Sequence, residues 1–180
     1  MTTTLKSTLS AQLGWTWRDV AGTLVVIDSN RLAFDADLAD GAGSAEADAI
    51  WHAADQTLLA GQAMTLELDA LAQSIFGDII TIPLAKVKAI LIVNKNGGQS
   101  GSLVVGGAAA NAWSAPFGTP GDTVCVMPGS PLVLANLCDG WDVPPGSHAL
   151  RLEAVGQPVT FDVAILGVLA GVEGSSSGSS

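Results

Sequence analysis

Apolar and polar residues alternate with a period of two along much of this chain. From Leu5 to Trp17 the odd positions are mostly apolar and the even positions mostly polar, which predicts a half-buried β-strand or a pair of such strands. The same alternation recurs over residues 64–69. Residues 85–94 alternate at first and then become continuously apolar, as a strand does when it enters a core. The sequence therefore predicts β-structure around a buried interior.

Strand-like segments of this kind are separated by turns rich in Gly, Pro, Asn and Asp, and about nine or ten strands are expected in total. This spacing is typical of an all-β protein. We expect an antiparallel β-sandwich or jelly-roll-like domain with an extended N-terminal segment and at most one or two short helices. The best helix candidate covers residues 68–78, where Asp69 is placed to cap a helix and Gly77 to end it.

The length of 180 residues suits one domain with an appendage. We interpret residues 1–50 as N-terminal strands with an acidic loop, a segment suited to contacts with other subunits. Residues 51–172 are expected to form the sandwich core, and residues 173–180 a flexible Ser/Gly tail. Within the first part, residues 34–51 are rich in Ala, Asp and Gly, and they predict a long loop that leads into a short strand at 50–53.

The composition is apolar and poor in charge. Charged residues make up 13% of the chain, and the mean hydropathy is +0.44. Ordinary soluble domains carry about 25% charged residues. We therefore expect much of the surface to be buried against copies of the chain or in a larger assembly. A tightly built β-domain with loops coated in Ser, Thr, Gly and Asn is the alternative.

The balance of 17 acidic to 7 basic residues gives a net charge of −10, and no cluster of Lys and Arg occurs. This excludes nucleic acid and anionic membrane surfaces as expected partners. The first ten residues do not predict a signal peptide, and the longest strongly apolar run, 163–172, is about half the ~20 residues of a membrane helix. Cys125 and Cys138 are accordingly expected to be reduced and mostly buried.

A glycine-rich stretch at residues 103–122 raises the question of a phosphate loop. It lacks the Lys and the Ser or Thr that complete a P-loop, and its glycines do not form a dinucleotide fingerprint. We interpret it as structural: a strand ends at Val105, and two glycines then turn the chain. Asn111 is expected to cap a turn, while Trp113 and Phe117 anchor the loop.

The acidic loop is the best metal candidate in the sequence, although no metal site is predicted. Asp35, Asp37 and Glu46 fall at positions 1, 3 and 12 of a calcium-loop template. Position 6 of that template requires glycine and is Asp40 here. A looser calcium site made by Asp35, Asp37 and Asp40 stays open as a weak alternative to a solvated loop.

Catalytic chemistry has little support in the sequence. The two histidines, His52 and His148, lie in separate segments, and no motif of a hydrolase, zinc enzyme or dithiol enzyme occurs. We therefore predict a protein without enzymatic activity, with no catalytic residues and no cofactor.

Five tryptophans and no tyrosine are unusual. Trp15 and Trp17 project from the same side of one predicted strand. They suit either a sugar-stacking platform or a core or subunit contact, and the second interpretation is favoured because large aromatic side chains dominate the energetics of cores and interfaces.

Over residues 51–167 the chain resembles a family of small virion-associated structural proteins of tailed bacteriophages. The stretches that carry the resemblance are LDALAQSIFGDIITIPLAKVKAILIVN, VVGGAAANAWSAPFG, VMPGSPLVLANLCDGWDV and VTFDVAILG. None of these stretches is a catalytic signature. The resemblance implies an all-β particle protein, such as a head decoration or cement protein or the base of a short fibre.

The resemblance also implies where the protein acts. We expect a homo-oligomer, with a trimer favoured, that is made in the host cytoplasm and binds the major capsid protein on the outer capsid surface of the virion. A carbohydrate- or receptor-binding module of a head or tail fibre is the alternative. The residues expected at interfaces are Trp15, Trp17, Asn111, Trp113 and Phe117.

Overall fold

The computed structural model describes residues 4–75, 77–98 and 100–171, and these residues form an all-β protein, as predicted. No helix within these ranges is long and apolar enough to cross a membrane. The strands are β1 (Ser7–Ala21), β2 (Leu24–Leu38), β3 (Ala49–Leu58), β4 (Ala63–Glu67), β5 (Leu71–Ile75), β6 (Asp78–Ile82), β7 (Leu84–Asn94), β8 (Ser102–Gly106), β9 (Thr123–Val126), β10 (Pro131–Ala135), β11 (Trp141–Asp142), β12 (Ala149–Val155) and β13 (Val159–Leu169).

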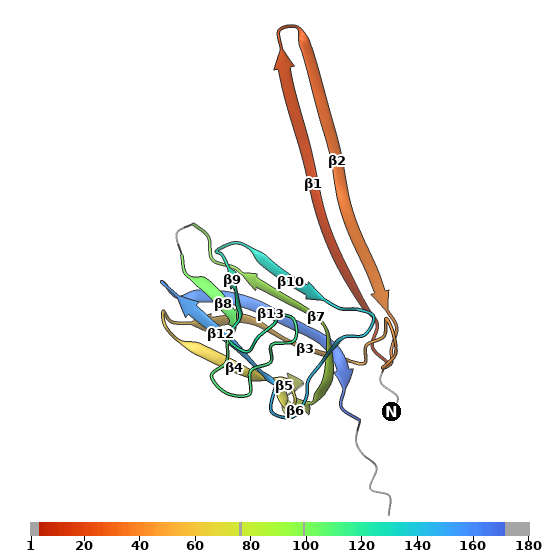
Figure 1. The fold of residues 1–180 in the computed structure, drawn as a ribbon, viewed down its shortest axis with the longest axis vertical. Helices are drawn as coiled ribbons and strands as arrows, with labels where there is room; N and C mark the ends of the chain where they lie inside the picture. Colours follow the sequence, from red (N-terminus) through yellow and green to blue (C-terminus); the bar gives the residue numbers. More distant parts are fainter. Residues whose placement is uncertain (1–3, 76, 99, 172–180) are drawn as a thin grey trace, which may run out of the picture.

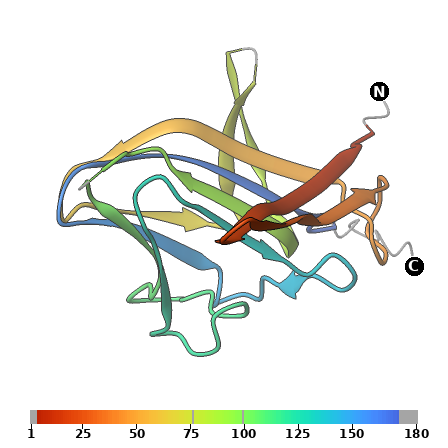
Figure 2. The ribbon, with the colours of Figure 1, turned by 90° about the horizontal axis from the view of Figure 1, so that it is seen from above.

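Two antiparallel sheets make up the body of the molecule, and their side chains share one core (Figures 1 and 2). The five-stranded sheet has the order β10-β7-β13-β3, with β11 paired to β7 beside β10, and the four-stranded sheet has the order β4-β12-β8-β9. The alternation predicted for residues 64–69 and the apolar run at 85–94 are confirmed as β4 and β7. Fully buried side chains from both sheets meet between them: Ile90, Ile92, Phe161, Ile165, Leu103, Val105, Leu150 and Leu152.

One buried polar side chain ties the sandwich together. Asn94 ends β7 and is fully buried, and its amide donates to the carbonyls of Gly101 (3.0 Å) and Val126 (3.1 Å). A buried amide is tolerated only when its hydrogen bonds are made, so these contacts fix β7 relative to β9 in the other sheet.

The N-terminal strands form a separate feature, a long hairpin that projects from the body (Figure 1). We call β1 and β2 the arm. Each strand has 15 residues, paired without a break from Ser7 opposite Leu38 to Ala21 opposite Leu24. At roughly 3.3 Å per residue the arm is about 50 Å long. Gly22, with φ of +66°, makes the turn at its tip.

Two predictions about this segment are wrong. The strand from Leu5 to Trp17 was expected to be half-buried, yet almost all of β1 is exposed because it pairs only with β2 and leaves the body. The loop expected at 34–51 is shorter, since β2 continues to Leu38 and β3 begins at Ala49. Large apolar residues at every second position, Leu32 and Phe34, continue the strand into the Asp- and Ala-rich region.

The helix expected at residues 68–78 is also wrong. This region instead forms the hairpin β5-β6, with Gly77 at φ +94° in its turn. Residues 79–82 contain three isoleucines and a threonine, whose branched side chains favour strands over helices. Leu68 and Leu71 are buried in the core, so the apolar residues that suggested a helical face serve the sandwich instead.

The base of the arm is fixed to the body by a small second core. Buried Leu38, Ala47, Ala89 and Leu166 form it, and Leu9 packs against them. Beside it, the ammonium of Lys88 is buried and donates to three backbone carbonyls, those of Gly43 (3.1 Å), Leu137 (3.3 Å) and Cys138 (2.5 Å). Lys88 therefore connects the segment that follows the arm to the turn before β11.

Candidate functional site

The arm has one apolar face, which is largely exposed. The strand register places the odd residues of β1 and the even residues of β2 on the same face. Exposed fractions there reach 68% for Leu13 and 70% for Leu32. We call this surface the apolar face of the arm, and its apolar members are Leu9, Ala11, Leu13, Trp15, Trp17, Ala21, Leu24, Val26, Leu32, Phe34, Ala36 and, buried at the base, Leu38.

The opposite face of the arm is polar over most of its length. There the hydroxyl of Thr8 donates to the carboxylate of Asp37 (2.7 Å), and the hydroxyls of Thr16 and Ser29 share a hydrogen bond (3.1 Å). Toward the tip this second face becomes apolar as well, with Val20 opposite Val25. The arm is thus amphipathic along its shaft and apolar on both faces at its tip.

An apolar ribbon of this kind is unstable alone in water. Isolated two-stranded hairpins are marginal at best, and the buried contacts of this one lie at its base. With a length of about 50 Å and a width of about 10 Å, one face covers roughly 500 Å², as large as the largest apolar patches of ordinary monomers. Because such patches mark interaction surfaces, the apolar face of the arm is the first candidate site.

Trp15 and Trp17 lie in the middle of this face and are 42% and 55% exposed. The strand register sets Trp15 opposite Asn30 and Trp17 opposite Asp28. The indole N–H of Trp15 donates to the carboxylate of Asp28 (3.2 Å). The two tryptophans therefore combine apolar ring surface with an amide and a carboxylate alongside.

A second apolar surface lies on the outer side of the five-stranded sheet. Two hollows there, of about 240 and 140 Å³, share Leu91 and Ala164 in their linings. We call them together the groove. Small-molecule sites usually enclose roughly 300–1,000 Å³, so these shallow hollows suit a protein surface better. The groove is lined by Ser7, Thr8, Leu9, Ile50, His52, Ala53, Ala54, Ala89, Leu91, Val93, Asp162, Val163, Ala164 and Leu166.

The groove begins where the arm leaves the body. Residues 7–9 at the base of the arm line one end, and His52 and Asp162 line the other. Ile50 and Leu91 are each 38% exposed, and Val133 on the neighbouring strand β10 is 39% exposed. Because the arm projects away from the sheet, it covers only the end of the groove next to its own base (Figure 1).

The acidic residues considered for calcium do not form a ligand group in the part of the chain that the structure describes. Asp35 and Asp37 lie on β2, and Asp37 accepts the hydroxyl of Thr8. Asp40 accepts the backbone N–H of Leu5 (2.8 Å). The carboxylates of Asp37 and Asp40 therefore serve the hydrogen bonding of the arm and its base.

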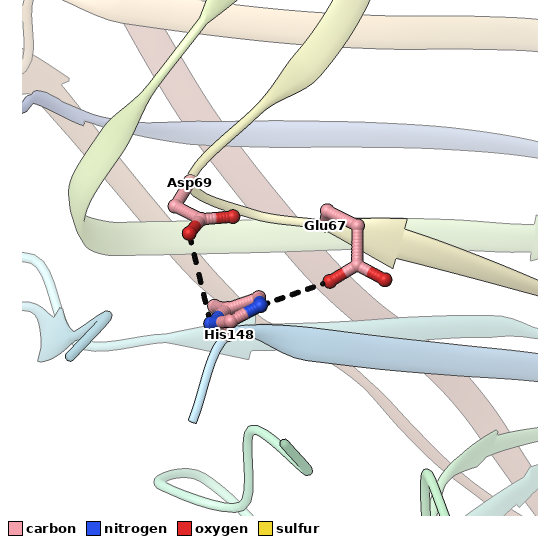
Figure 3. A group of neighbouring side chains, drawn as sticks. All are labelled: Glu67, Asp69 and His148. Atoms are coloured by element: carbon pink, nitrogen blue, oxygen red, sulfur yellow. Dashed lines mark ion pairs between the residues drawn. The ribbon is translucent and has the colours of Figure 1, made fainter. Parts of the chain in front are cut away.

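A different cluster brings together Glu67, Asp69 and His148 at the edge where β4 meets β12 (Figure 3). The imidazole Nε2 of His148 lies 3.2 Å from Glu67, and Nδ1 lies 3.6 Å from Asp69. The two carboxylates face different ring nitrogens, so the imidazole lies between them and no single ring nitrogen faces both. Within the described residues, the buried Nδ1 atom has no hydrogen-bond partner.

The loop that follows β8 is structural, as predicted. Gly106 and Gly107 have φ of +103° and +65°, and a Cβ on Gly106 would lie 2.7 Å from the carbonyl oxygen of Asp122. Asn111 has φ of +50°, which asparagine tolerates, and its backbone carbonyl accepts the N–H groups of His148 and Ala149.

The aromatic anchors of this loop lie in or against the core. Trp113 is 1% exposed and contacts Phe117 and Trp141 edge to face, at centroid distances of 6.3 Å. Its burial confirms the anchoring role and leaves it no surface for the interface role that was also considered. Phe117 is partly buried against the same core. Cys125 and Cys138 are free but exposed, so the prediction of buried thiols is wrong.

Several features of the sites were not found from the sequence. The pairing of Trp15 and Trp17 with Asp28 and Asn30 depends on the hairpin register, and the mirrored alternation around Gly22 was the signal for it. The cluster at His148 depends on the pairing of β4 with β12, which are far apart in sequence and carry no local signal for each other.

The fold and these surfaces define a class of protein: an all-β sandwich that carries a projecting amphipathic hairpin beside an apolar groove. Comparisons find no matching protein family, curated protein or solved structure.

Proposed function

We propose that this chain is a non-enzymatic structural protein of a tailed-phage virion, a homo-oligomer with a trimer favoured. In this proposal it binds the major capsid protein on the outer head surface and stabilises the head as a decoration or cement protein. The observation that carries the proposal is the exposed apolar face of the arm, which another protein must cover in water. The resemblance of residues 51–167 to virion-associated proteins supports the particle as the place of assembly.

The charge distribution supports assembly through the arm rather than through other surfaces. The chain carries a net charge of −10, so most contacts between copies would bring acidic groups together. On the apolar face of the arm only Asp19 and Asp28 carry a charge. Contacts made there bury apolar surface at little electrostatic cost.

The size of the effect follows from the exposure of single residues. Leu13 is 68% exposed, and full burial of a leucine contributes about 1.5–3 kcal/mol. Covering it on assembly therefore contributes about 1–2 kcal/mol per contact, or roughly tenfold in affinity. An aspartate at this position would also have to lose its hydration, so Leu13→Asp should weaken each contact considerably more.

Sedimentation velocity over a concentration series tests the proposal. The full chain should form an oligomer that Leu13→Asp dissociates, whereas Thr16→Asp, on the polar face of the same strand, should leave it intact. The full chain should also sediment with empty capsids of the phage that encodes it, and Leu13→Asp should not. A chain that stays monomeric at every concentration and does not bind the capsids would refute the proposal.

The fibre module is a second candidate, favoured by one specific observation. Trp15 and Trp17 are exposed side by side with Asn30 and Asp28 opposite them, and sugar sites combine stacking aromatic rings with polar partners. A glycan array probed with the full chain tests this candidate. Binding that Trp17→Ala abolishes and Thr16→Ala preserves would favour the fibre module, and an array without binding would reject it.

A further inference from the structure

We infer that the arm of each copy packs its apolar face into the groove of a second copy, so that the subunits form a closed ring. This inference rests on the proposed assembly through the arm and adds the surface that receives it. The groove and the apolar face of the arm are the two large apolar surfaces around the base of the arm, and one chain supplies both.

One contact between the apolar face of the arm and the groove is already made within the chain. Leu9 belongs to the apolar face of the arm, and it lines the groove together with Ile50, Leu91 and Ala164. No arm residue beyond Leu9 lines the groove, and the groove continues toward His52 and Val93. A second arm laid along this remainder would repeat the side-chain contacts that Leu9 makes at the base.

The dimensions of the two surfaces agree. Strand β7 and strand β13 each have 11 residues, so the outer face of the sheet is roughly 35 Å long, and the arm of about 50 Å can span it. The part of the ribbon that lies on the sheet covers roughly 350 Å² and buries about 700 Å² when both partners are counted, so the tip that extends beyond the sheet has to supply the rest of an interface of about 1,000 Å². Packing a ribbon on a sheet face is the geometry of a sandwich layer.

Charge and symmetry favour a copy of the chain as the occupant. Asp162 is the one carboxylate that lines the groove, and it already bonds to Lys95 and to the backbone N–H of Asp55. An acidic neighbour can therefore approach without facing unpaired acids. Because the arm and the groove are different surfaces, the contact is head-to-tail, which gives a closed ring such as the trimer proposed above when the rotation between subunits closes, and an open filament when it does not.

Cross-linking between differently substituted chains tests the inference. In a background of Cys125→Ser and Cys138→Ser, which removes both exposed native thiols, one chain carries Leu13→Cys or Trp17→Cys and the other carries Leu91→Cys. After subunit exchange, a bismaleimide of about 10 Å reach should join the arm of one chain to the groove of the other. The two arm positions lie about 13 Å apart along the strand, so together they sample the part of the arm expected to pass Leu91. Thr65→Cys, on the outer face of the other sheet, is the control and should not react.

The outcomes separate this inference from the function on which it rests. Arm-to-arm products alone, or no product between the arm of one chain and Leu91→Cys of the other, would overturn the inference and leave assembly through the arm standing. As a second measurement, Leu91→Asp should raise the dissociation constant of the oligomer at least tenfold, and Thr65→Asp should not. If Leu13→Asp dissociates the oligomer and a folded Leu91→Asp does not, the groove is not the receptor. If neither does, the proposed function fails as well.

Discussion

The buried ammonium of Lys88 allows a stability prediction whose size can be worked out from its contacts. Lys88→Met keeps the length of the side chain and removes its three hydrogen bonds. The carbonyls of Gly43 and Leu137 each keep a backbone N–H donor, at 3.3 and 3.1 Å, so they stay satisfied. Among these three carbonyls, only that of Cys138 loses its hydrogen-bond partner, and an unsatisfied carbonyl costs about 1–3 kcal/mol. We therefore expect a loss of about 1–3 kcal/mol in the free energy of unfolding.

Equilibrium unfolding in urea at a fixed protein concentration measures this loss, because an oligomer's stability depends on concentration. Lys86→Met is the matched control: Lys86 lies two residues away on β7, and its side chain is 40% exposed in its pair with Asp142 (3.2 Å). An exposed pair of this kind contributes about 0–1 kcal/mol. Lys88→Ala, which also leaves a cavity, should lose more than Lys88→Met. Equal urea midpoints for Lys88→Met and Lys86→Met would refute the reasoning.

Three further predictions concern the body of the molecule. Asn94→Ala leaves two carbonyls without their amide donor and should cost about 2 kcal/mol or more in urea unfolding, whereas an unchanged midpoint would show that water replaces the amide. Gly106→Ala must take φ of +103° with its Cβ against a backbone oxygen, so a loss of about 2 kcal/mol or more is expected by the same assay, and a neutral substitution would contradict the strain. The backbone N–H of Asp55, and then Lys95, hold the pKa of Asp162 below its ordinary 3.8. The stability that the ionised carboxylate contributes is present above pH 3.8 and is lost as the pH falls through the lowered pKa. Asp162→Asn should therefore make the free energy of unfolding fall less steeply at acid pH. Equal slopes for the substituted and the unsubstituted chain would contradict this role of Asp162.

Much of the body could be predicted because its signals are local. The period-two alternation of β4 and the continuous apolar run of β7 each report on burial of their own strand. The two glycines at the end of β8 were assigned correctly to a turn, because a pair of glycines at the end of a strand favours the positive φ values that both adopt. The hairpin at 71–82 was missed because Leu68, Leu71 and Ile75 are spaced at helical intervals, and this spacing outweighed the three isoleucines at 79–82 that favour a strand.

The exposure of the arm could not be predicted from its own residues. Alternation shows that one face differs from the other, but it does not show which neighbour covers the apolar face or whether any does. The pattern from Leu5 to Trp17 is that of a strand on a core, and in this chain the core is missing over most of its length. The burial of Lys88 was unpredictable for a similar reason, since its three acceptors are backbone carbonyls of two distant turns.

The exposed apolar residues of this charge-poor chain are concentrated on the arm, and this bears on how the proposed assembly would proceed. Of the 19 large hydrophobic residues exposed in the described ranges, ten lie on the arm, while the sandwich core is complete without them. The arm is apolar on one face along its shaft and on both faces at its tip. At the tip the pair Val20 and Val25 lies on one face, and the pair Ala21 and Leu24 lies on the other. A groove that covers one face satisfies the shaft but leaves half of the tip in water. In the proposed assembly the tip would therefore reach beyond the groove to a place enclosed on both sides, and its contacts would add to those that the shaft makes in the groove.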